Sequence, residues 1–184
     1  MQQYLDILKQ YWGYDQFRPL QGDIIQSIAS GKDTLALLPT GGGKSLCYQL
    51  PALIMEGTCM VVSPLIALMK DQVMQLKFRN IEAEYLSAEL DEAEAEEIYS
   101  RCREGITKLL YVSPERLANP AFLEHLLDIQ LSFIAVDEAH CISEWGQDFR
   151  PGYQNIKTFR NDHPELACLA LTATATPKVL SEII

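Results

Sequence analysis

A glycine-rich segment has the residue types needed to hold a chain of phosphate groups. It is Leu38-Pro-Thr-Gly-Gly-Gly-Lys-Ser45, and it lies between an apolar, β-rich run at 34–38 and a helical pattern that begins at Leu46. Glycines allow successive backbone N–H groups to point inward, and the start of the next helix adds partial positive charge. We expect a cradle for nucleotide phosphates, in which Lys44 contacts the β- and γ-phosphates and the Ser45 hydroxyl binds Mg²⁺. The remaining residues of this cradle would be Thr40, Gly41, Gly42 and Gly43.

This segment is a variant of the common phosphate-binding pattern, which has glycine at the position of Leu38. A glycine-rich turn between a strand and a helix, without a ligand, is the alternative. The order of strand, Gly-Lys-Ser and helix favours nucleotide binding.

A second reactive group follows the apolar run Leu131–Val136 and consists of Asp137-Glu138-Ala139-His140. Hydrolysis of ATP needs a second anchor for Mg²⁺ and a group that positions the attacking water. We expect Asp137 to bind Mg²⁺ and Glu138 to act as the general base. An Asp-Glu pair at a strand end is often only a turn, but the Lys44 segment upstream favours the catalytic interpretation.

The elements that must position these residues alternate along the chain. Short apolar runs are separated by helical patterns, and the runs are Thr34–Leu38, Cys59–Val62, Lys108–Val112, Leu131–Val136 and Cys168–Thr172. Two helical faces are marked by Leu20, Ile24, Ile25 and Ile28, and by Ile66, Met69, Val73 and Leu76. This alternation predicts an α/β fold in one domain, 1–184, with a mainly parallel sheet and helices on both faces. Ligands of such sheets bind at the carboxyl ends of the strands, where both reactive groups lie.

Composition narrows the class of protein. The apolar fraction of 48% and charged fraction of 22% are typical of a globular domain, and no apolar run reaches the roughly 20 residues that span a bilayer. Five widely spaced cysteines favour buried thiols over disulfides or a zinc site. We therefore expect an intracellular protein without a membrane segment. The net charge of −10 counts against broad attraction to nucleic acid, although much of it falls at 91–97, in what we interpret as a solvated helix face.

Three ordered motifs resemble those of superfamily 2 helicases: the glycine-rich loop, Asp-Glu-Ala-His, and Leu171-Thr-Ala-Thr-Ala-Thr176. Two further stretches, 12–21 and 141–153, resemble the RecQ family of DNA helicases. The resemblance covers essentially the whole chain. It implies a RecA-like P-loop domain that binds ATP and Mg²⁺ and works on DNA, cytoplasmic in bacteria or nuclear in eukaryotes.

The resemblance implies an adenine site near the start of the chain. Tyr14 and Arg18 would sandwich the base, and Gln21 would pair with it through one donor and one acceptor. The alternative is that Tyr14 is a core aromatic and Gln21 only begins a helix. We assign Phe17 to the core.

The resemblance also implies contacts with single-stranded and partly duplex DNA. In the stretch after the acidic motif, Trp145 and Phe149 would stack on bases and Arg150 would contact phosphate, and His140 would transmit this contact to the site of hydrolysis. Family members often have His where this chain has Gln147, and this departure affects the expected coupling between the loop and the site of hydrolysis. The segments 63–72 and 113–116 follow two other strands, and Ser63 and Ser113 would contact the DNA backbone there. Thr172 and Thr174 resemble the motif that links hydrolysis to strand separation, although threonines at a strand end are common. Ser63 and Ser113 could equally cap the helices that follow them. We interpret Lys70 as a solvated helix residue. For Trp145 and Phe149, the alternative is that they are buried core aromatics.

The chain ends at Ile184, inside an expected helix that begins near Pro177. The resemblance implies a second RecA-like domain, which supplies an arginine to the γ-phosphate, and zinc-binding and winged-helix regions. We therefore expect a fragment that hydrolyses ATP poorly alone. Two other functions remain open: a nucleotide-binding or interaction module without catalytic output, and an RNA helicase of the same superfamily.

Overall fold

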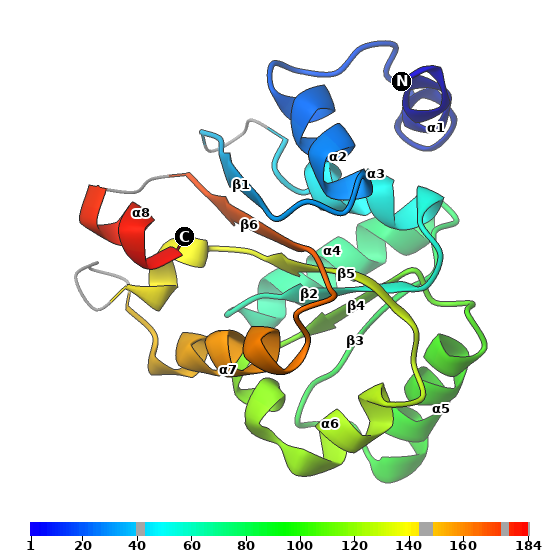
Figure 1. Ribbon diagram of the computed structural model, residues 1–184. Helices are drawn as coiled ribbons and strands as arrows, with labels where there is room; N and C mark the ends of the chain where they lie inside the picture. The colour runs from blue at the N-terminus through cyan, green and yellow to red at the C-terminus, as the bar shows by residue number, and fades with distance from the viewer. Residues whose placement is uncertain (40–42, 144–148, 174–176, 184) are drawn as a thin grey trace.

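A six-stranded parallel sheet forms the centre of the molecule (Figure 1). The computed structural model describes residues 1–39, 43–143, 149–173 and 177–183. The strands are β1 (Thr34–Leu37), β2 (Thr58–Val62), β3 (Ala83–Tyr85), β4 (Leu109–Val112), β5 (Leu131–Val136) and β6 (Cys168–Thr172). Their order across the sheet is β1-β6-β5-β2-β4-β3, and every pairing is parallel. The predicted α/β class with a parallel sheet is confirmed.

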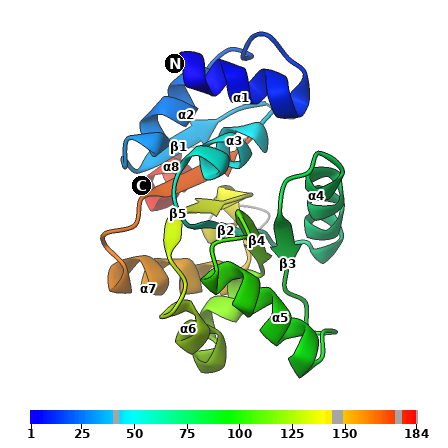
Figure 2. The same ribbon diagram turned by 90° about the vertical axis from the view of Figure 1, so that its right-hand side faces the viewer.

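Helices cover both faces of this sheet (Figures 1 and 2). One face is covered by α2 (Gln21–Ala29), α3 (Leu46–Ile54) and α4 (Ile66–Phe78), and the other by α5 (Glu92–Arg103), α6 (Pro120–Leu126) and α7 (Gln154–Asp162). Helix α1 (Gln2–Trp12) packs outside α2 and α3, and α8 (Pro177–Ile183) follows β6. Short 3₁₀ turns are η1 (Pro114–Ala118), η2 (Ala139–Ile142) and η3 (Pro151–Tyr153).

The two layers of core follow from the period of two along each strand. In β2, Cys59 and Val61 face the layer under α2, α3 and α4, whereas Met60 and Val62 face the opposite layer. All five residues of this central strand are buried, which is why it is a continuous apolar run rather than an alternating one.

Two predicted helix faces were wrong at their first residue. Leu20 is 56% exposed and precedes α2 with φ 71°, so the buried face begins with Gln21. Ile66 is 50% exposed because it begins α4 ahead of the turn that contacts the sheet. Strand β3 was missed, since three residues at the sheet edge are too few to make a hydrophobic pattern.

The predicted role of the cysteines is confirmed, because all five are buried and free. Burial raises the pKa of the Cys47 thiol to about 12 and of the Cys102 and Cys168 thiols to about 11. The acidic residues at 91–97 lie at the start of α5 and are exposed, as predicted. Within the described ranges, no helix combines the length and apolar character needed to cross a membrane.

Candidate active site

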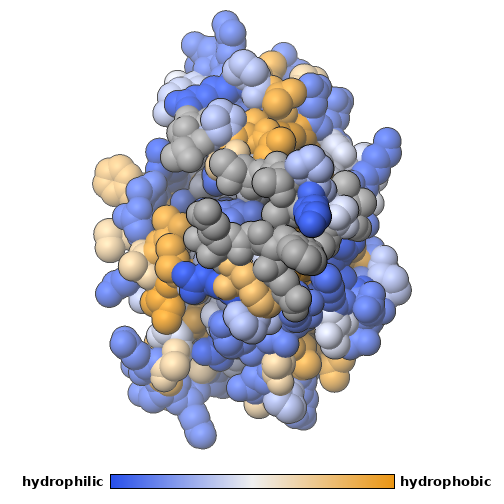
Figure 3. Space-filling view, turned by 90° about the vertical axis from the view of Figure 1, so that its left-hand side faces the viewer, coloured by the Kyte–Doolittle hydropathy of each residue, from blue (hydrophilic) through white to orange (hydrophobic). Residues whose placement is uncertain are grey.

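The carboxyl ends of the six parallel strands share one edge of the sheet, and both reactive groups predicted from the sequence lie there. The glycine-rich segment follows β1, the acidic motif follows β5, and Thr172 ends β6 between them. Figure 3 faces this edge and shows hydrophilic surface in its central hollow. Thr40, Gly41 and Gly42 lie outside the described residues, so the loop is seen from Gly43 onward.

Gly43 and Gln21 are interlocked. Gly43 has φ +78°, in the region that favours glycine, and a Cβ on it would lie 2.1 Å from Nε2 of Gln21. This Nε2 donates to the Gly43 carbonyl at 3.1 Å, and the Gln21 side-chain oxygen accepts from the backbone N–H of Arg18 at 2.8 Å. Gln21 therefore ties the predicted adenine-binding segment to the phosphate loop, a role that the sequence did not reveal.

A cavity of about 540 Å³ contains the predicted nucleotide-binding residues that the structure describes. Its lining includes Tyr14, Arg18, Gln21, Gly43, Lys44 and Ser45. Tyr14 is 55% exposed, so it is not the core aromatic of the alternative interpretation, whereas Phe17 packs against the small core of α1, α2 and α3 as predicted. The volume lies within the roughly 300–1,000 Å³ of small-molecule sites.

A chain of polar contacts crosses from the phosphate loop to the acidic motif and on to β6. Lys44 Nζ lies 3.9 Å from Glu138 Oε1, and the other oxygen of Glu138 lies 3.5 Å from His140 Nδ1. The same His140 nitrogen is 2.9 Å from the hydroxyl of Thr172. Thr172 is fully buried, so this contact joins the acidic motif to the core of the sheet. The structure thus brings together residues from three segments that lie far apart in the sequence.

Asp137 is held by its backbone at the tip of β5. Its N–H donates to the Val62 carbonyl at 2.9 Å, and its carbonyl accepts from the Tyr153 hydroxyl at 2.8 Å. Burial raises the pKa of the Asp137 carboxyl, the neighbouring Glu138 carboxylate raises it further, and Lys44 opposes both. A carboxylate that is costly to ionise in the free protein is well suited to a cation, because a positive charge would offset that cost.

Glu138 has a strained backbone. Its φ of 52° and ψ of 45° place it in the left-handed region, which is uncommon for residues other than glycine. This conformation directs consecutive side chains, Asp137 and Glu138, in different directions from one strand end. Strain of this kind costs about 1–3 kcal/mol and concentrates at functional sites.

The Ser45 hydroxyl has a partner that sequence reasoning missed. Ser45 precedes α3 but makes no side-chain cap to it, and its Oγ instead accepts from Gln72 Nε2 at 3.0 Å. Gln72 belongs to α4, at the end of the segment 63–72 that the sequence associates with DNA. Nothing in the spacing of Ser45 and Gln72 could have revealed the contact, because it depends on how α4 packs against α3.

The structure describes only some of the predicted DNA-contacting residues. Ser63 is only 2% exposed, and no other described group makes a hydrogen bond to its hydroxyl, so the side chain is not accessible to DNA in this conformation. Ser113 is half-buried, and neither serine caps the helix after it. Arg150 is exposed and Phe149 half-buried, while Trp145 and Thr174 lie outside the described residues. These roles remain predictions, and Lys70 is exposed on α4 as expected.

The site suits a nucleotide with a divalent cation. A hydroxyl at Ser45 and a carboxylate at Asp137 are oxygen donors of the kind that Mg²⁺ prefers, and Lys44 supplies a cation for phosphate. Across the part of the chain that is described, no cluster of three or more His, Cys, Asp or Glu side chains could hold a metal ion by itself.

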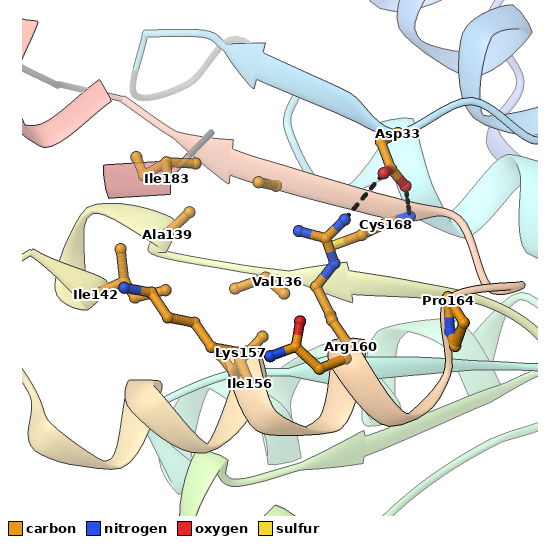
Figure 4. Close-up of a pocket in the computed structure, with 12 residues that line it drawn as sticks. Asp33, Val136, Ala139, Ile142, Ile156, Lys157, Arg160, Pro164, Cys168 and Ile183 are labelled. Carbon is orange, nitrogen blue, oxygen red and sulfur yellow. Dashed lines mark hydrogen bonds and ion pairs between the residues drawn. The ribbon is translucent and has the colours of Figure 1, made fainter. Parts of the chain in front are cut away.

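A second cavity of about 440 Å³ lies between α7, β5 and β6 (Figure 4). Its most prominent charges already have partners, because Asp33 pairs with Arg160 at 2.9 Å and accepts from the Cys168 N–H at 2.9 Å. The acidic motif contributes only the apolar side chain of Ala139 to its lining. Lys157 also lines this cavity, but no described residue of the glycine-rich loop and no acidic side chain of the motif does.

A parallel sheet with a glycine-rich phosphate loop after β1 and an acidic motif after β5 defines a RecA-like nucleotide-binding domain. The chain matches the DEAD/DEAH box helicase family over residues 18–183, and it belongs to that family. A crystal structure of the helicase MrfA bound to DNA and AMPPNP has the same fold, with a TM-score of 0.77 at 18% identity, over 98% of this chain and 27% of that one.

Comparison with individual relatives shows which type of helicase the chain resembles. The chain is 47% identical to the ATP-dependent DNA helicase RecQ of Bacillus subtilis over 179 residues, which are 96% of this chain and 30% of the relative. It is 45% identical to the protein of the same name from Pasteurella multocida, over 98% of this chain and 28% of the relative. The resemblance to RecQ helicases is confirmed, and this chain spans less than a third of each relative.

Proposed function

We propose that this chain is the first RecA-like motor domain of a RecQ-type, ATP-dependent 3′→5′ DNA helicase. The observation that carries the proposal is the contact chain from Lys44, which lines a nucleotide-sized cavity, through Glu138 to His140 and Thr172. This arrangement joins a phosphate cation to a carboxylate that can position water. The names of the relatives support ATP as the nucleotide.

In this proposal each part of the cavity has one task. Tyr14, Arg18 and Gln21 hold adenine, and the glycine loop with Lys44 holds the phosphates. Ser45 and Asp137 hold Mg²⁺, which when bound neutralises charge on the phosphates. Glu138 accepts the proton of the attacking water, and its contact with Lys44 in the free protein keeps its carboxylate directed at the phosphate side.

DNA would bind along the carboxyl edge of the sheet, with Trp145, Phe149 and Arg150 as principal contacts and Ser63, Ser113 and Thr174 nearby. A second RecA-like domain in the whole protein would close over the nucleotide and complete the site. On this basis the 184-residue chain alone hydrolyses ATP poorly, because an arginine finger, here expected from that second domain, contributes about 10³–10⁵ in rate.

The rival functions are less well supported. The relatives are named DNA helicases, which favours DNA over RNA as the substrate. A binding module without catalytic output would have no need of the Glu138 conformation, whose backbone strain must be sustained by the rest of the fold.

The decisive experiment measures ATP hydrolysis by the whole protein against single-stranded DNA concentration, carried to a plateau. We expect strong stimulation in the wild type. Trp145→Ala should keep basal hydrolysis and lose only about 1–3 kcal/mol of DNA binding, yet reach a much lower plateau. Phe78→Ala is the control, because Phe78 is an aromatic residue 89% exposed on α4.

Two outcomes would count against the proposal. Equal stimulation by RNA would favour the RNA helicase, and the absence of any hydrolysis would favour the binding module. A Trp145→Ala protein that reaches the wild-type plateau at higher DNA concentration would limit Trp145 to binding.

A further inference from the structure

Gln72 connects the phosphate loop to a cluster of buried polar side chains beneath it. Its Nε2 donates to Ser45 Oγ at 3.0 Å, from the middle of α4 to the first residue before α3. Its Oε1 accepts from Gln49 Nε2 at 2.7 Å and lies 3.2 Å from the hydroxyls of Tyr48 and Tyr111, which also bond to each other at 3.1 Å, so that one phenol at a time donates to Gln72. The amide of Gln72 therefore has hydrogen-bond partners at both ends.

The surroundings of Gln72 fix which end of its amide faces Ser45. Tyr48, Gln49 and Tyr111 are all buried, with exposed fractions of 6% or less. Burial raises the pKa of both phenols, so each keeps a proton that it can donate. Because the hydrogen-bond donors lie on the Oε1 side of the Gln72 amide, the amide nitrogen faces Ser45.

We propose that Gln72 is a positioning residue for the bound cation, because it orients the Ser45 hydroxyl so that one lone pair faces the Mg²⁺ site. A serine hydroxyl has two lone pairs, and the N–H of Gln72 occupies one of them. Ser45 does not cap α3; its hydroxyl is held by Gln72 together with a side-chain contact to the Tyr48 phenol, which itself belongs to the Gln72 cluster. The inference rests on the proposed ATP and Mg²⁺ site and adds a residue from outside the motifs that form it.

The energetic argument concerns preorganisation. An unheld serine hydroxyl rotates among three staggered positions, and only some of them direct a lone pair at the cation. Groups that orient a metal ligand without touching the metal typically contribute 10–100-fold to metal affinity or activity. Disturbing the buried cluster is costly, because a buried polar group without a hydrogen-bond partner destabilises the folded protein by about 1–3 kcal/mol.

The experiment measures how strongly Mg²⁺ tightens binding of a fluorescent, non-hydrolysable ATP analogue to this chain. The dissociation constant is measured with Mg²⁺ and with EDTA, and the ratio of the two is compared among variants. We expect Gln72→Met to keep the affinity in EDTA within about twofold and to reduce the Mg²⁺ ratio by about tenfold or more. Methionine has a similar length and lacks the amide.

Two further variants separate positioning from packing. Gln75→Met, one turn along α4, is the matched control, because Gln75 is exposed and its amide bonds only to Asp71 among the contacts described; its ratio should equal that of the wild type. Tyr111→Phe removes one donor to Gln72 without touching Ser45, and it should lower the ratio by a smaller factor. Melting temperatures establish that each variant is folded, and Tyr111→Phe decides the question if Gln72→Met does not fold.

The outcomes distinguish this inference from the proposed function. If the wild type binds the analogue with no help from Mg²⁺, the proposed cation site is wrong. If the wild type shows the Mg²⁺ effect and Gln72→Met retains it in full, the positioning role is overturned. It is also overturned if affinities in EDTA and in Mg²⁺ fall equally, because Gln72 would then only support the loop.

Discussion

The two halves of the candidate nucleotide site are built differently. In the phosphate half, Lys44, Glu138, His140 and Thr172 form one chain of contacts anchored in the sheet. In the adenine half, Tyr14 is 55% exposed and Arg18 is also exposed, on the segment between α1 and α2. The phosphate half is thus preorganised, whereas the adenine half presents an exposed ring and an exposed guanidinium at the surface.

This difference matches what each half has to do. Phosphoryl transfer depends on fixed positions and fixed charges, so its groups benefit from rigid strand ends. A stacking contact tolerates small shifts, because any base presents a flat face. Gln21 joins the halves, since it contacts both Arg18 and Gly43.

The largest effect is expected from Lys44→Ala, which removes the cation of the phosphate half. ATP turnover by the whole protein should fall by at least about 10²-fold, because preorganised charge at a developing negative charge is worth that much. The melting temperature should change little, since the ion pair with Glu138 is long, at 3.9 Å. Lys9→Ala, at an exposed lysine on α1, is the control. Turnover near that of the wild type would remove Lys44 from the site.

Gln21→Ala tests whether the residue between the halves reads the base. The wild type should prefer ATP to CTP, and the variant should lose most of this preference, about tenfold to a hundredfold for two hydrogen bonds of roughly 0.5–1.5 kcal/mol each. The measurement is the ratio of the dissociation constants for ATP and CTP. Binding of inorganic triphosphate serves as the control for the loop itself. A wild type that uses ATP and CTP equally would contradict the assignment.

Tyr14→Ala should have a smaller and less selective effect. A lost stacking contact costs about 1–3 kcal/mol, and it should weaken ATP and CTP binding alike because both bases have a π-face. The ATP/CTP ratio should therefore stay at its wild-type value. If Tyr14→Ala changes this ratio as much as Gln21→Ala does, the exposed ring contributes to recognition and not only to stacking.

The sequence was sufficient to predict the fold class and the edge of the sheet at which the candidate site lies. Long apolar runs such as Leu131–Val136 predicted strands whose carboxyl ends meet, and the boundaries of β5 and β6 were the same in the structure. Both results have one cause, since parallel strands place their ends together whatever the connecting helices do. The roles of the motif residues Lys44, Glu138 and His140 remain predictions, although the structure brings their side chains together.

The sequence could not reveal contacts between helices packed on the same face of the sheet. Gln72 and Ser45 lie 27 residues apart, and their hydrogen bond depends on the relative position of α3 and α4. Nor could it show that the Ser63 hydroxyl is buried, because a polar residue after a strand is usually expected at the surface. Both results depend on tertiary packing, which local spacing does not encode.

The smallest effect is expected for the stability of the phosphate half, where Asp137→Asn should raise the melting temperature slightly at neutral pH. Burial and Glu138 raise the pKa of the Asp137 carboxyl, so the folded protein holds this proton more tightly than the unfolded chain does. The stabilising contribution is complete below the unfolded pKa of about 3.9 and is lost as pH rises through the folded pKa. At neutral pH the wild type bears the full cost of an ionised, partly buried carboxylate, and asparagine avoids that cost while it still accepts from the Glu138 N–H.

Melting curves of the wild type and Asp137→Asn, taken from pH 4 to pH 8, test this expectation, with Asp71→Asn on the exposed side of α4 as the control. The gap between wild type and Asp137→Asn should widen as pH rises, and the Asp71→Asn control should show no such trend. A Mg²⁺-bound ATP analogue should reverse the order, because the cation would stabilise only the protein that has the carboxylate. If Asp137→Asn is the less stable protein at neutral pH without ligand, then Lys44 already compensates the charge. The phosphate half would in that case be electrostatically balanced in the free protein, rather than set up in advance for a cation.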